Sequence, residues 1–476
     1  MPISTEIAIR MDTEDFLTPE SDGALESVLD ALERQAARAT FPVVAEKLRT
    51  WGRRGHHHLI SRLARHAVGY HSDTHSVHPT IAEELAELSF TQGQAAFTAR
   101  EAAGFAEVRA AFGTLSCWTQ PGGNWTAAAL PVMRAFGVPM DFSEGWNSYL
   151  DVGSQPCYYG GLLHWSPPVL APKPFLSALP TCLPAALQMV EQALATRPAD
   201  SPPLCVVAHP TELCTHAFWD AVNFARGRSP APSEWRPAPL RPAVDITAAA
   251  DALNRYLKEL RAMGLQFVTA QDLASRYPDR TVGSVVSREE VLDMAHTSLT
   301  EANWAVRGDR ALSAAEVLPL VCGALCRPAI DHWTVRFIAG PEDTPIQQAP
   351  ISGPLARSSI VTAAGWCERF VTEHSAVPTV LPLDRAWAAP ADFLVVAAQA
   401  LSHPDREVLP IEPCAVAAEA YVKPPARLHW DWPVFPEGFA PKGLWRQARG
   451  QAWTLKPALP ASARDHNRDR WHTSPL

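Results

Sequence analysis

The sequence predicts an α/β fold for the first 283 residues and a smaller, mainly helical region after them. From residue 5 to about 280, short apolar runs alternate with amphipathic helical stretches, which is the pattern of β/α folds. A chain of 476 residues is also longer than one hydrophobic core usually supports. After about residue 285 the alternation ends, and two similar helical segments follow.

The expected elements run in chain order. "EIAIRMD" is a first strand, "GALESVLDALERQAARA" a helix, and "LISRLARHA" a second helix that leads into the strand "AVGYH". One or two further helices are expected in "TIAEELAELSFTQGQAAFTAREAAGF". "LCVVAHP" is a later strand, and "AAADALNRYLKELRAMG" with "LQFVTAQDLASRY" closes this region as helix, strand and helix. The proline-rich stretches at 166–180 and 229–243 predict long loops.

The region after residue 283 contains a short internal repeat. The segments 312–325 and 388–401 can be laid over one another, with Glu316 over Asp392. Ser313, three residues before Glu316, gives the capping-box pattern that starts a helix. We therefore expect two related helical units packed together.

Three regions follow from these patterns. Residues 1–283 form the α/β domain, residues 284–460 form a helical C-terminal domain with an internal duplication, and the polar residues 461–476 form a disordered tail.

Composition excludes several classes of protein. Apolar residues make up 47% of the chain, and no apolar run approaches the ~20 residues of a membrane helix. A net charge of -9 argues against nucleic acid as a partner. The first residues show no basic segment followed by a long apolar one, and the 9 cysteines are odd in number and contain no CxxC pair. We expect a cytoplasmic protein with reduced thiols and no membrane partner.

Two carboxylates lie on one face at the end of the first strand. Side chains of an extended segment alternate between faces, so Asp12 and Glu14 point one way while Thr13 and Asp15 point the other. Two neighbouring carboxylates need a positive charge close by. A metal ion at the carboxyl ends of the strands is the expected compensator.

Histidines at the ends of two later strands complete this pattern. "HSDTH" supplies His71 and His75, and two imidazoles with one carboxylate form a metal shell that leaves positions open for water or substrate. His209 ends the apolar strand "LCVVAHP", where it could donate a proton to a leaving group. The cluster "GHHHL" instead opens a helix, and solvated or capping roles are expected for its histidines.

Five segments together resemble a known family. "IAIRMDTED", "VGYHSDTHSVHP", "CWTQPGGNW", "CVVAHP" and "YLKELRAMGLQFVTAQDL" are similar, in order and approximate spacing, to the polysaccharide deacetylase or NodB-homology group of carbohydrate esterases. The resemblance implies a distorted (β/α)7 barrel that binds one divalent metal, usually zinc, and removes acyl groups from amides of sugars.

The resemblance also implies roles for individual residues. Asp12 corresponds to the catalytic base, His71 and His75 to metal ligands, and His209 to the general acid. Strand alternation favours Glu14 as the acidic ligand. Asp15 is the alternative, because the common form of this motif has adjacent aspartates whereas this chain has "DTED".

The chain departs from the family in "WTQP". Where the family has an arginine two residues before proline, this chain has Thr119. The sequence therefore predicts that the positive partner of the base carboxylate is missing, and that substrate choice differs from chitin-type sugars.

Four residues around this motif are expected to line the substrate site, namely Trp118, Gln120, Asn124 and Trp125. Asp141 and Trp165 are candidates for the later aspartate and tryptophan of the family.

Three functions remain open at this point. The first is a metal-dependent deacylase of N-acylated sugars or glycans. The second is a hydrolase of a small non-sugar amide, as in allantoinase-like relatives of the group. The third is a catalytically silent glycan-binding protein, in which the duplicated helical units and the aromatic segment 429–439 contact sugar rings.

Overall fold

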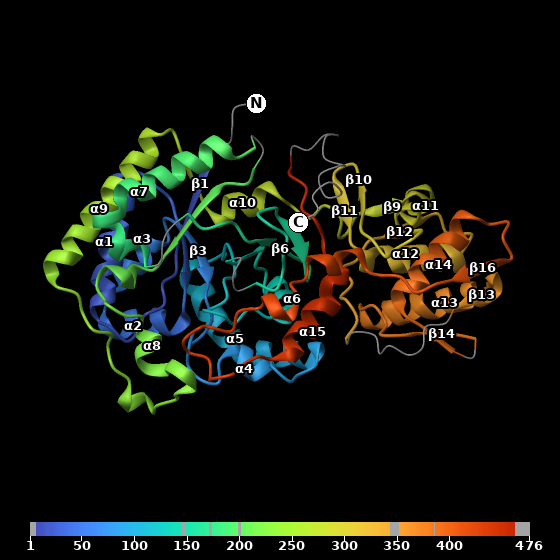
Figure 1. The fold of residues 1–476 in the computed structure, drawn as a ribbon, viewed down its shortest axis with the longest axis horizontal. Helices are drawn as coiled ribbons and strands as arrows, with labels where there is room; N and C mark the ends of the chain where they lie inside the picture. The colour runs from blue at the N-terminus through green and yellow to red at the C-terminus, as the bar shows by residue number, and fades with distance from the viewer. Residues whose placement is uncertain are drawn as a thin grey trace.

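The computed structural model describes residues 6–144, 148–170, 174–198, 201–342, 352–384 and 386–461. Two lobes lie side by side along the long axis of the molecule (Figure 1). The tail expected at 461–476 lies outside the described residues, apart from Ala461.

The first lobe has the mixed α/β character that the sequence predicts. Its strands are β1 (Glu6–Met11), β2 (Thr40–Val43), β3 (Ala67–Tyr70), β4 (Met140–Phe142), β5 (Cys157–Tyr159), β6 (Leu162–Trp165), β7 (Leu204–Ala208) and β8 (Gln266–Val268). Its helices are α1 (Glu20–Arg34), α2 (Ala45–Arg54), α3 (His57–Leu63), α4 (Ile81–Leu85), α5 (Phe90–Phe112), α6 (Ala129–Ala135), α7 (Phe175–Thr196), α8 (Trp219–Phe224), α9 (Ala243–Ala262) and α10 (Ala270–Arg276).

A parallel sheet around β1 positions the site. The strand order is β3-β2-β1-β7, and β8 also pairs with β1 in parallel. Ile7, Ile9 and Met11 on one face and Ala8 and Arg10 on the other are all buried, as expected for a central strand covered on both faces. Because parallel strands end at the same edge, the residues that follow β1, β3 and β7 meet there.

The end of one expected loop is a helix. The stretch 166–180 was expected to be a loop, but α7 begins at Phe175 and contains Pro180. Phe175 and Leu179 are buried, and the Phe175 ring contacts Tyr256 of α9 at a centroid distance of 5.3 Å. Burial of this apolar face outweighs the cost of proline inside the helix.

The second lobe contains one arrangement twice. The first copy comprises β9 (Val285–Ser287), α11 (Arg288–Ala295), β10 (Ala305–Arg307), β11 (Arg310–Leu312), α12 (Ala314–Cys326) and β12 (His332–Thr334). The second comprises β13 (Gly353–Ala356), α13 (Arg357–His374), β14 (Leu381–Leu383), β15 (Ala386–Ala388), α14 (Pro390–Ser402) and β16 (Val408–Ile411).

Each copy thus reads strand, helix, hairpin, helix, strand, and its first and last strands pair antiparallel. The two segments aligned from the sequence fall on α12 and α14, and the capping box of Ser313 and Glu316 is present. The region is therefore less purely helical than expected, because short antiparallel strand pairs frame each helix pair.

The last described segment returns to the first lobe. Helix α15 (Lys442–Gly450) lies beside that lobe (Figure 1), and Gln447 Nε2 donates to the carbonyl oxygen of Leu88 over 2.7 Å. Strand β17 (Lys456–Pro457) pairs antiparallel with β5 in a sheet of order β17-β5-β6-β4. The expected domain of 284–460 is thus not self-contained, because its end completes the first lobe.

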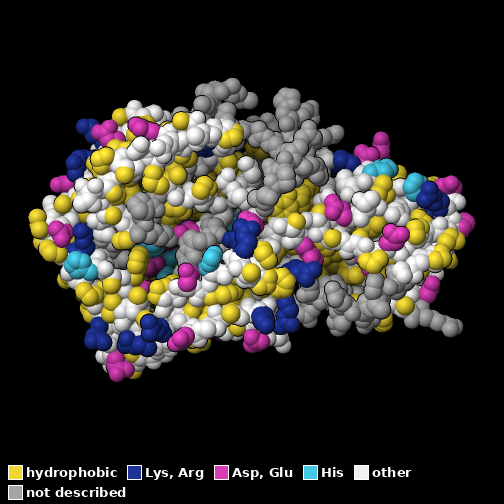
Figure 2. All heavy atoms as spheres, in the orientation of Figure 1, with side chains coloured by type: hydrophobic (Ala, Val, Ile, Leu, Met, Phe, Trp, Pro, Cys, Tyr) yellow, Lys and Arg dark blue, Asp and Glu magenta, His cyan; other side chains and the backbone are white. Residues whose placement is uncertain are grey.

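On the face drawn in Figure 2, basic and acidic side chains are interspersed among apolar atoms. Within the described ranges, no helix combines the length and apolar character needed to cross a bilayer.

Candidate active site

Three residues from the ends of β1 and β3 bring their ligand atoms together. Glu14, His71 and His75 are buried, and one ligand atom of each lies within 4.8 Å of the others. Glu14 Oε2 is 3.3 Å from His71 Nε2 and 2.9 Å from His75 Nε2. One carboxylate and two imidazoles match the donor set expected from the sequence.

Each imidazole is held through its other ring nitrogen. Nδ1 of His71 lies 2.9 Å from the carbonyl oxygen of Thr119 and donates to it. Nδ1 of His75 lies 2.5 Å from Ser76 Oγ, which in turn donates to Asp220 Oδ2 over 3.0 Å. Both rings therefore direct Nε2 toward Glu14, which is the orientation in which metal-binding histidines offer this nitrogen to a cation.

The loop that carries these histidines has a strained backbone. Ser72 and His75 adopt φ values of 76° and 55°, which are unusual for residues other than glycine. The backbone N–H of His75 donates to Ser72 Oγ over 3.0 Å and stabilises this turn. Such strain persists where the surroundings over-determine it, which is common at functional sites.

These three residues fit a divalent cation. Nε2 of His75 is buried and lacks a hydrogen-bond partner with good geometry, although Glu14 lies close to it. Burial would raise the pKa of Glu14, but His75, His209 and His71 hold it well below its usual value. Burial would lower the pKa of His75, yet Glu14 raises it. A cation bound here would displace the proton that Glu14 favours on His75.

Asp12 has a positive partner, contrary to the sequence-based expectation. Arg10 donates from Nε to Asp12 Oδ1 over 2.9 Å and from NH2 to Asp12 Oδ2 over 2.7 Å. It also donates to Glu144 Oε1 over 3.0 Å and to the carbonyl of Phe142 over 2.8 Å. The guanidinium comes from β1 itself rather than from the position that Thr119 occupies. Residues 10 and 12 share one face of the strand, so Arg10 reaches Asp12.

His209 faces the same space from the end of β7. Its Nε2 lies 3.8 Å from Asp12 Oδ2, and its Nδ1 lies 2.9 Å from Glu212 Oε1. Burial alone would lower the pKa of His209, but the carboxylates of Glu14, Glu212 and Asp12 raise it to about 9. The surrounding carboxylates therefore favour the protonated imidazole.

Asp15, the alternative metal ligand, is engaged elsewhere. Its Oδ1 accepts hydrogen bonds from the backbone N–H groups of Leu17 and Thr18 at 3.0 and 2.9 Å, and its Oδ2 accepts from Thr211 Oγ1 at 2.9 Å. Asp15 shapes the turn after β1, and the structure brings Glu14 rather than Asp15 to the histidines.

A cavity of about 280 Å³ connects these groups. Asp12, Glu14, His71, His75 and His209 all line it, so the structure brings the predicted catalytic and metal-binding side chains to one space. Other parts of its wall are Arg10, Gln120, Gly122, Glu144, Phe218, Asp220, Ala221, Trp432 and Pro433. We call it the catalytic cavity.

Of the four residues predicted to bind substrate, Gln120 lines this cavity. Its Nε2 is buried without a hydrogen-bond partner, while its Oε1 lies 2.8 Å from Ser143 Oγ. Trp118 and Trp125 are buried in the core, and neither is among the residues that line this cavity. Asn124 Oδ1 instead accepts a hydrogen bond from the backbone N–H of Ala82.

The two tryptophans fill space between strands. Trp118 packs against Tyr70 and Phe97 at centroid distances of 5.7 Å. Trp125 donates from Nε1 to Asp141 Oδ2 over 3.1 Å. The candidate Asp141 therefore belongs to a buried network, and Ser143 joins it to Gln120 in the wall of the cavity. The candidate Trp165 is buried in the core.

Two further residues reach the site from far along the chain; sequence reasoning missed Asp220 and included Trp432 only within the aromatic segment 429–439. Asp220, on α8, accepts the hydrogen bond from Ser76 Oγ and so fixes the hydroxyl that contacts His75. Trp432 lies over the site from the segment that follows the second lobe, with its ring 5.8 Å from that of His75. Gly122 lies beneath it, and a Cβ atom at that position would overlap the indole. Asp220 carries no local signal of its role, whereas Trp432 belongs to the aromatic segment 429–439 that the sequence indicated for contact with sugar rings.

No protein-family model matches the sequence, and no curated relative is significantly similar to it. Several solved structures are similar to the fold. The neighbours are carbohydrate esterases of family 4 and related proteins. The chain is thus similar in structure to polysaccharide deacetylases of that family over somewhat more than half of its length.

One of these structures is a peptidoglycan N-acetylglucosamine deacetylase, with 14% identity, a TM-score of 0.32, and coverage of 56% of this chain and 86% of that one. Another is a family 4 carbohydrate esterase from Streptomyces lividans in complex with acetate, with 16% identity, a TM-score of 0.29, and coverage of 56% and 92%. A third is a mutant, with restored activity, of a family 4 pseudoenzyme from Bacillus anthracis, with 13% identity, a TM-score of 0.31, and coverage of 58% and 69%. These values are too low to assign an activity.

Proposed function

We propose that the protein is a metal-dependent hydrolase that removes N-acyl groups, such as acetyl, from a sugar or polysaccharide. The observation that carries this proposal is the convergence of Glu14, His71 and His75 within one cavity that also contains Asp12 and His209. Two imidazoles and one carboxylate, with space beside them, suit a catalytic rather than a structural divalent cation. We propose zinc as that cation.

A cation at this place would supply Lewis acidity toward the scissile carbonyl and would lower the pKa of water. The remaining steps fall to the side chains. Asp12 is buried and its pKa is low, because Arg10, His71 and His209 outweigh the effect of burial. It is thus ionised and able to accept a proton from the attacking water.

His209 would protonate the departing amine. Its Nε2 lies 3.8 Å from Asp12 Oδ2, so acid and base line the same side of the cavity that would receive the amide. Glu212 fixes the orientation of the ring through Nδ1. The side-chain amide of Gln120, in the wall of the cavity, is available for a hydrogen bond to the substrate.

We also infer that the first lobe closes as the distorted (β/α)7 barrel that the family resemblance implies. Parallel bridges join Tyr70 to Trp118 and Trp118 to Asp141, which extends the sheet from β3 toward β4. A further parallel bridge joins Val169, just after β6, to Cys205 of β7. These bridges support a continuous path of strands from β7 through β1 and back to β7.

Metal content and acetate release test the function. Protein purified without chelator should contain about one zinc per chain and should release acetate from N-acetylated oligosaccharides. His75→Ala should lose the metal, whereas Asp12→Asn should retain metal and lose turnover. His57→Ala, which removes an exposed histidine outside the site, is the matched control and should retain both. A chain without stoichiometric metal would support the silent binding protein, and release from ureides alone would support the small-amide hydrolase.

A further inference from the structure

The side-chain amide of Gln120 lies in the wall of the catalytic cavity, next to a candidate metal ligand. Gln120 is 4% exposed and follows Thr119, whose carbonyl oxygen lies 2.9 Å from Nδ1 of His71. The inner end of the amide, Oε1, lies 2.8 Å from Ser143 Oγ, and the other end, Nε2, is buried without a hydrogen-bond partner. Because the nitrogen donates and the oxygen accepts, the orientation of this amide decides what the cavity offers a substrate.

A chain of hydrogen bonds leads from Gln120 into the core. Ser143 Oγ lies 2.6 Å from Asp141 Oδ1. Asp141 Oδ2 accepts from Trp125 Nε1 at 3.1 Å and lies 2.7 Å from His164 Nδ1. All of these side chains are buried. Asp141 is thus a carboxylate surrounded by three donors, which is what a buried negative charge needs.

Ser143 has one proton for two neighbours. Its hydroxyl lies within hydrogen-bond distance of Asp141 and of the inner end of Gln120. A carboxylate can only accept, so the proton of Ser143 goes to Asp141, which is also the shorter and charge-assisted contact. The Ser143 oxygen then needs a donor from Gln120. With Oε1 in that place two acceptors meet, and the buried Nε2 stays unpaired at a cost of about 1–3 kcal/mol.

Half a turn of the Gln120 amide removes both conflicts. The turn exchanges nitrogen and oxygen but keeps the shape of the amide, so the packing around it is unchanged. Nε2 then donates to Ser143, and Oε1 faces the catalytic cavity as an acceptor. This orientation pairs the donors at both ends of the chain, as buried polar groups in proteins generally are.

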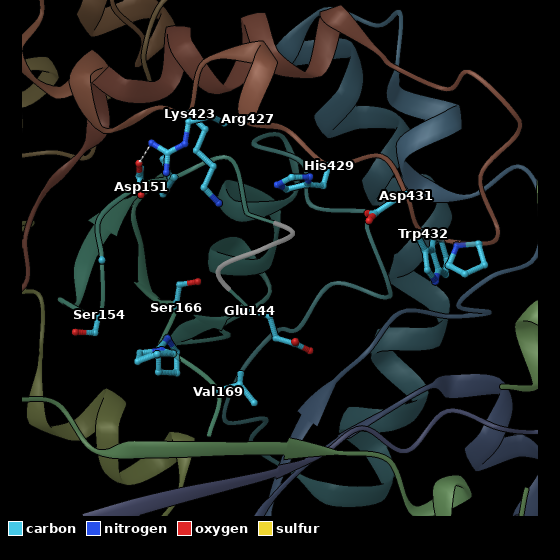
Figure 3. Close-up of a pocket in the computed structure, with 15 residues that line it drawn as sticks. Glu144, Asp151, Ser154, Ser166, Val169, Lys423, Arg427, His429, Asp431 and Trp432 are labelled. Atoms are coloured by element: carbon cyan, nitrogen blue, oxygen red, sulfur yellow. Dashed lines mark hydrogen bonds and ion pairs between the residues drawn. The ribbon is translucent and has the colours of Figure 1, made fainter. Parts of the chain in front are cut away.

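Two carboxylates in the same wall are already engaged by a cation. Asp12 and Glu144 share the guanidinium of Arg10, at 2.7 and 3.0 Å. Figure 3 shows Glu144 and Trp432 beside a larger space of about 970 Å³, and both residues also line the catalytic cavity. The amide oxygen of Gln120, which is neutral, is therefore the acceptor suited to a neutral donor of the substrate.

An acceptor at this place distinguishes amides from esters. The scissile nitrogen of an N-acyl substrate carries a hydrogen, whereas the corresponding oxygen of an O-acyl ester has only lone pairs. A site that pairs the N–H discriminates against an analogue without it, because the buried acceptor of the site is then left unpaired.

We propose that Gln120 presents its amide oxygen to the catalytic cavity, that Ser143 and Asp141 hold it in this orientation, and that this oxygen accepts a hydrogen bond from the N–H of the scissile amide. Gln120 is then a specificity-determining residue, and Ser143 and Asp141 are positioning residues. The proposal rests on the proposed function and deepens it, because it assigns the choice of N-acyl over O-acyl substrates to one hydrogen-bond chain.

Neutron diffraction from crystals of the perdeuterated full-length protein tests the orientation without any need for activity. We expect two deuterons on the Gln120 atom that faces Ser143, and the Ser143 deuteron directed at Asp141. Asp141→Asn should reverse both, because the new amide donates to Ser143, which then donates to Gln120 Oε1. Deuterons on the cavity side of the Gln120 amide in the wild-type protein would overturn the proposal.

Kinetics with a matched pair of probes test the specificity. The probes are methyl glucosides that carry an N-acetyl or an O-acetyl group on the same ring carbon, and kcat/KM of each zinc-loaded variant is divided by the wild-type value for that probe. Gln120→Met should lower this quotient about ten-fold for the amide and about two-fold or less for the ester. Asp141→Asn should lower it at least about ten-fold for the amide alone, because two N–H groups would then meet. Equal losses with both probes would overturn the proposal, because a merely structural role affects both alike.

Two substitutions on α14 are the matched controls. Gln399→Met removes an amide that donates to the carbonyl oxygen of Leu299, and Asp392→Asn changes another buried carboxylate. Neither should alter the ratio between the probes. If urea unfolding shows that Asp141→Asn does not fold, Ser143→Ala takes its place, and it should lower the amide-to-ester ratio about two-fold because the Gln120 amide is then free to turn.

The proposed function fails separately, if the wild-type protein with zinc releases acetate from neither probe. The claim about specificity falls with it, whereas the diffraction experiment still decides the orientation of Gln120.

Discussion

Arg10→Met removes a buried guanidinium that contacts two carboxylates. Arg10 is 3% exposed, and its contacts are two hydrogen bonds to Asp12, one to Glu144 and one to the carbonyl oxygen of Phe142. Methionine fills similar volume but leaves both carboxylates without this cation. We therefore expect a loss of stability and a change in the titration of Asp12.

The magnitude follows from these contacts. Removing one partner of a buried ion pair costs about 3–5 kcal/mol, because the other charge stays buried. Proton uptake by a carboxylate relieves part of that cost, so we expect the free energy of unfolding at neutral pH to fall by about 4 kcal/mol.

The loss should depend on pH in a defined direction. Arg10 helps to lower the pKa of Asp12 in the wild-type protein. Without the guanidinium, the folded-state pKa of Asp12 rises above the unfolded value of about 3.9, and the folded state binds the proton more tightly. The destabilisation should therefore shrink as pH falls from neutral toward that unfolded value.

Urea unfolding near pH 7 and near pH 5, with a chelator present so that bound metal adds nothing, measures this effect. Arg34→Met is the matched control, because Arg34 is 61% exposed and its pair with Asp30 spans 3.7 Å. Such surface pairs contribute about 0–1 kcal/mol. A loss in Arg10→Met no larger than in Arg34→Met, or one that grows as pH falls, would refute the assigned role of Arg10.

Two further perturbations test the packing of the site and of the core. Gly122→Ala should lower the free energy of unfolding by about 1–3 kcal/mol, because the added Cβ would overlap Trp432. The same overlap should lower kcat/KM. Gly55→Ala is the control, because Gly55 also has a positive φ but has open space around it. Equal losses of stability in the two variants, measured by urea unfolding, would contradict the overlap with Trp432. Partial burial lowers the pKa of His66 from about 6.5 to about 4. The unfolded chain therefore binds the proton more tightly, and the free energy of unfolding should fall by about 2–3 kcal/mol as pH drops from about 6.5 toward 4. His66→Asn should lack this pH-dependent part in urea unfolding series, and an unchanged series would exclude His66 as its source.

Local patterns predicted the parts of the site that local geometry controls. The alternation of a strand placed Asp12 and Glu14 on one face, and the spacing of "HSDTH" placed His71 and His75 at the end of the next strand. The same alternation applies to Arg10, two residues before Asp12. The expectation of a missing positive partner was wrong because it followed the family position at Thr119 rather than the face of β1.

Contacts between distant segments explain what the sequence did not predict. Ser76 and Asp220 are 144 residues apart, and no spacing rule links them. Trp118 and Trp125 lie next to Gln120 in sequence, but the bridge from Tyr70 to Trp118 turns this segment into a strand-like element with its indoles in the core. A tryptophan satisfies core packing and ligand stacking equally well, so residue type alone could not decide between them.

The return of the chain to the first lobe has consequences for how the whole protein works. Trp432 covers Gly122, Gln447 bonds Leu88, and Lys456 bridges Glu316 to the first lobe at 3.0 Å. Ending the chain at residue 283 would remove the pairing of β17 with β5 and the part of the catalytic cavity's wall that Trp432 and Pro433 form. The repeated second lobe is therefore inserted, in structural terms, between two parts of the first lobe.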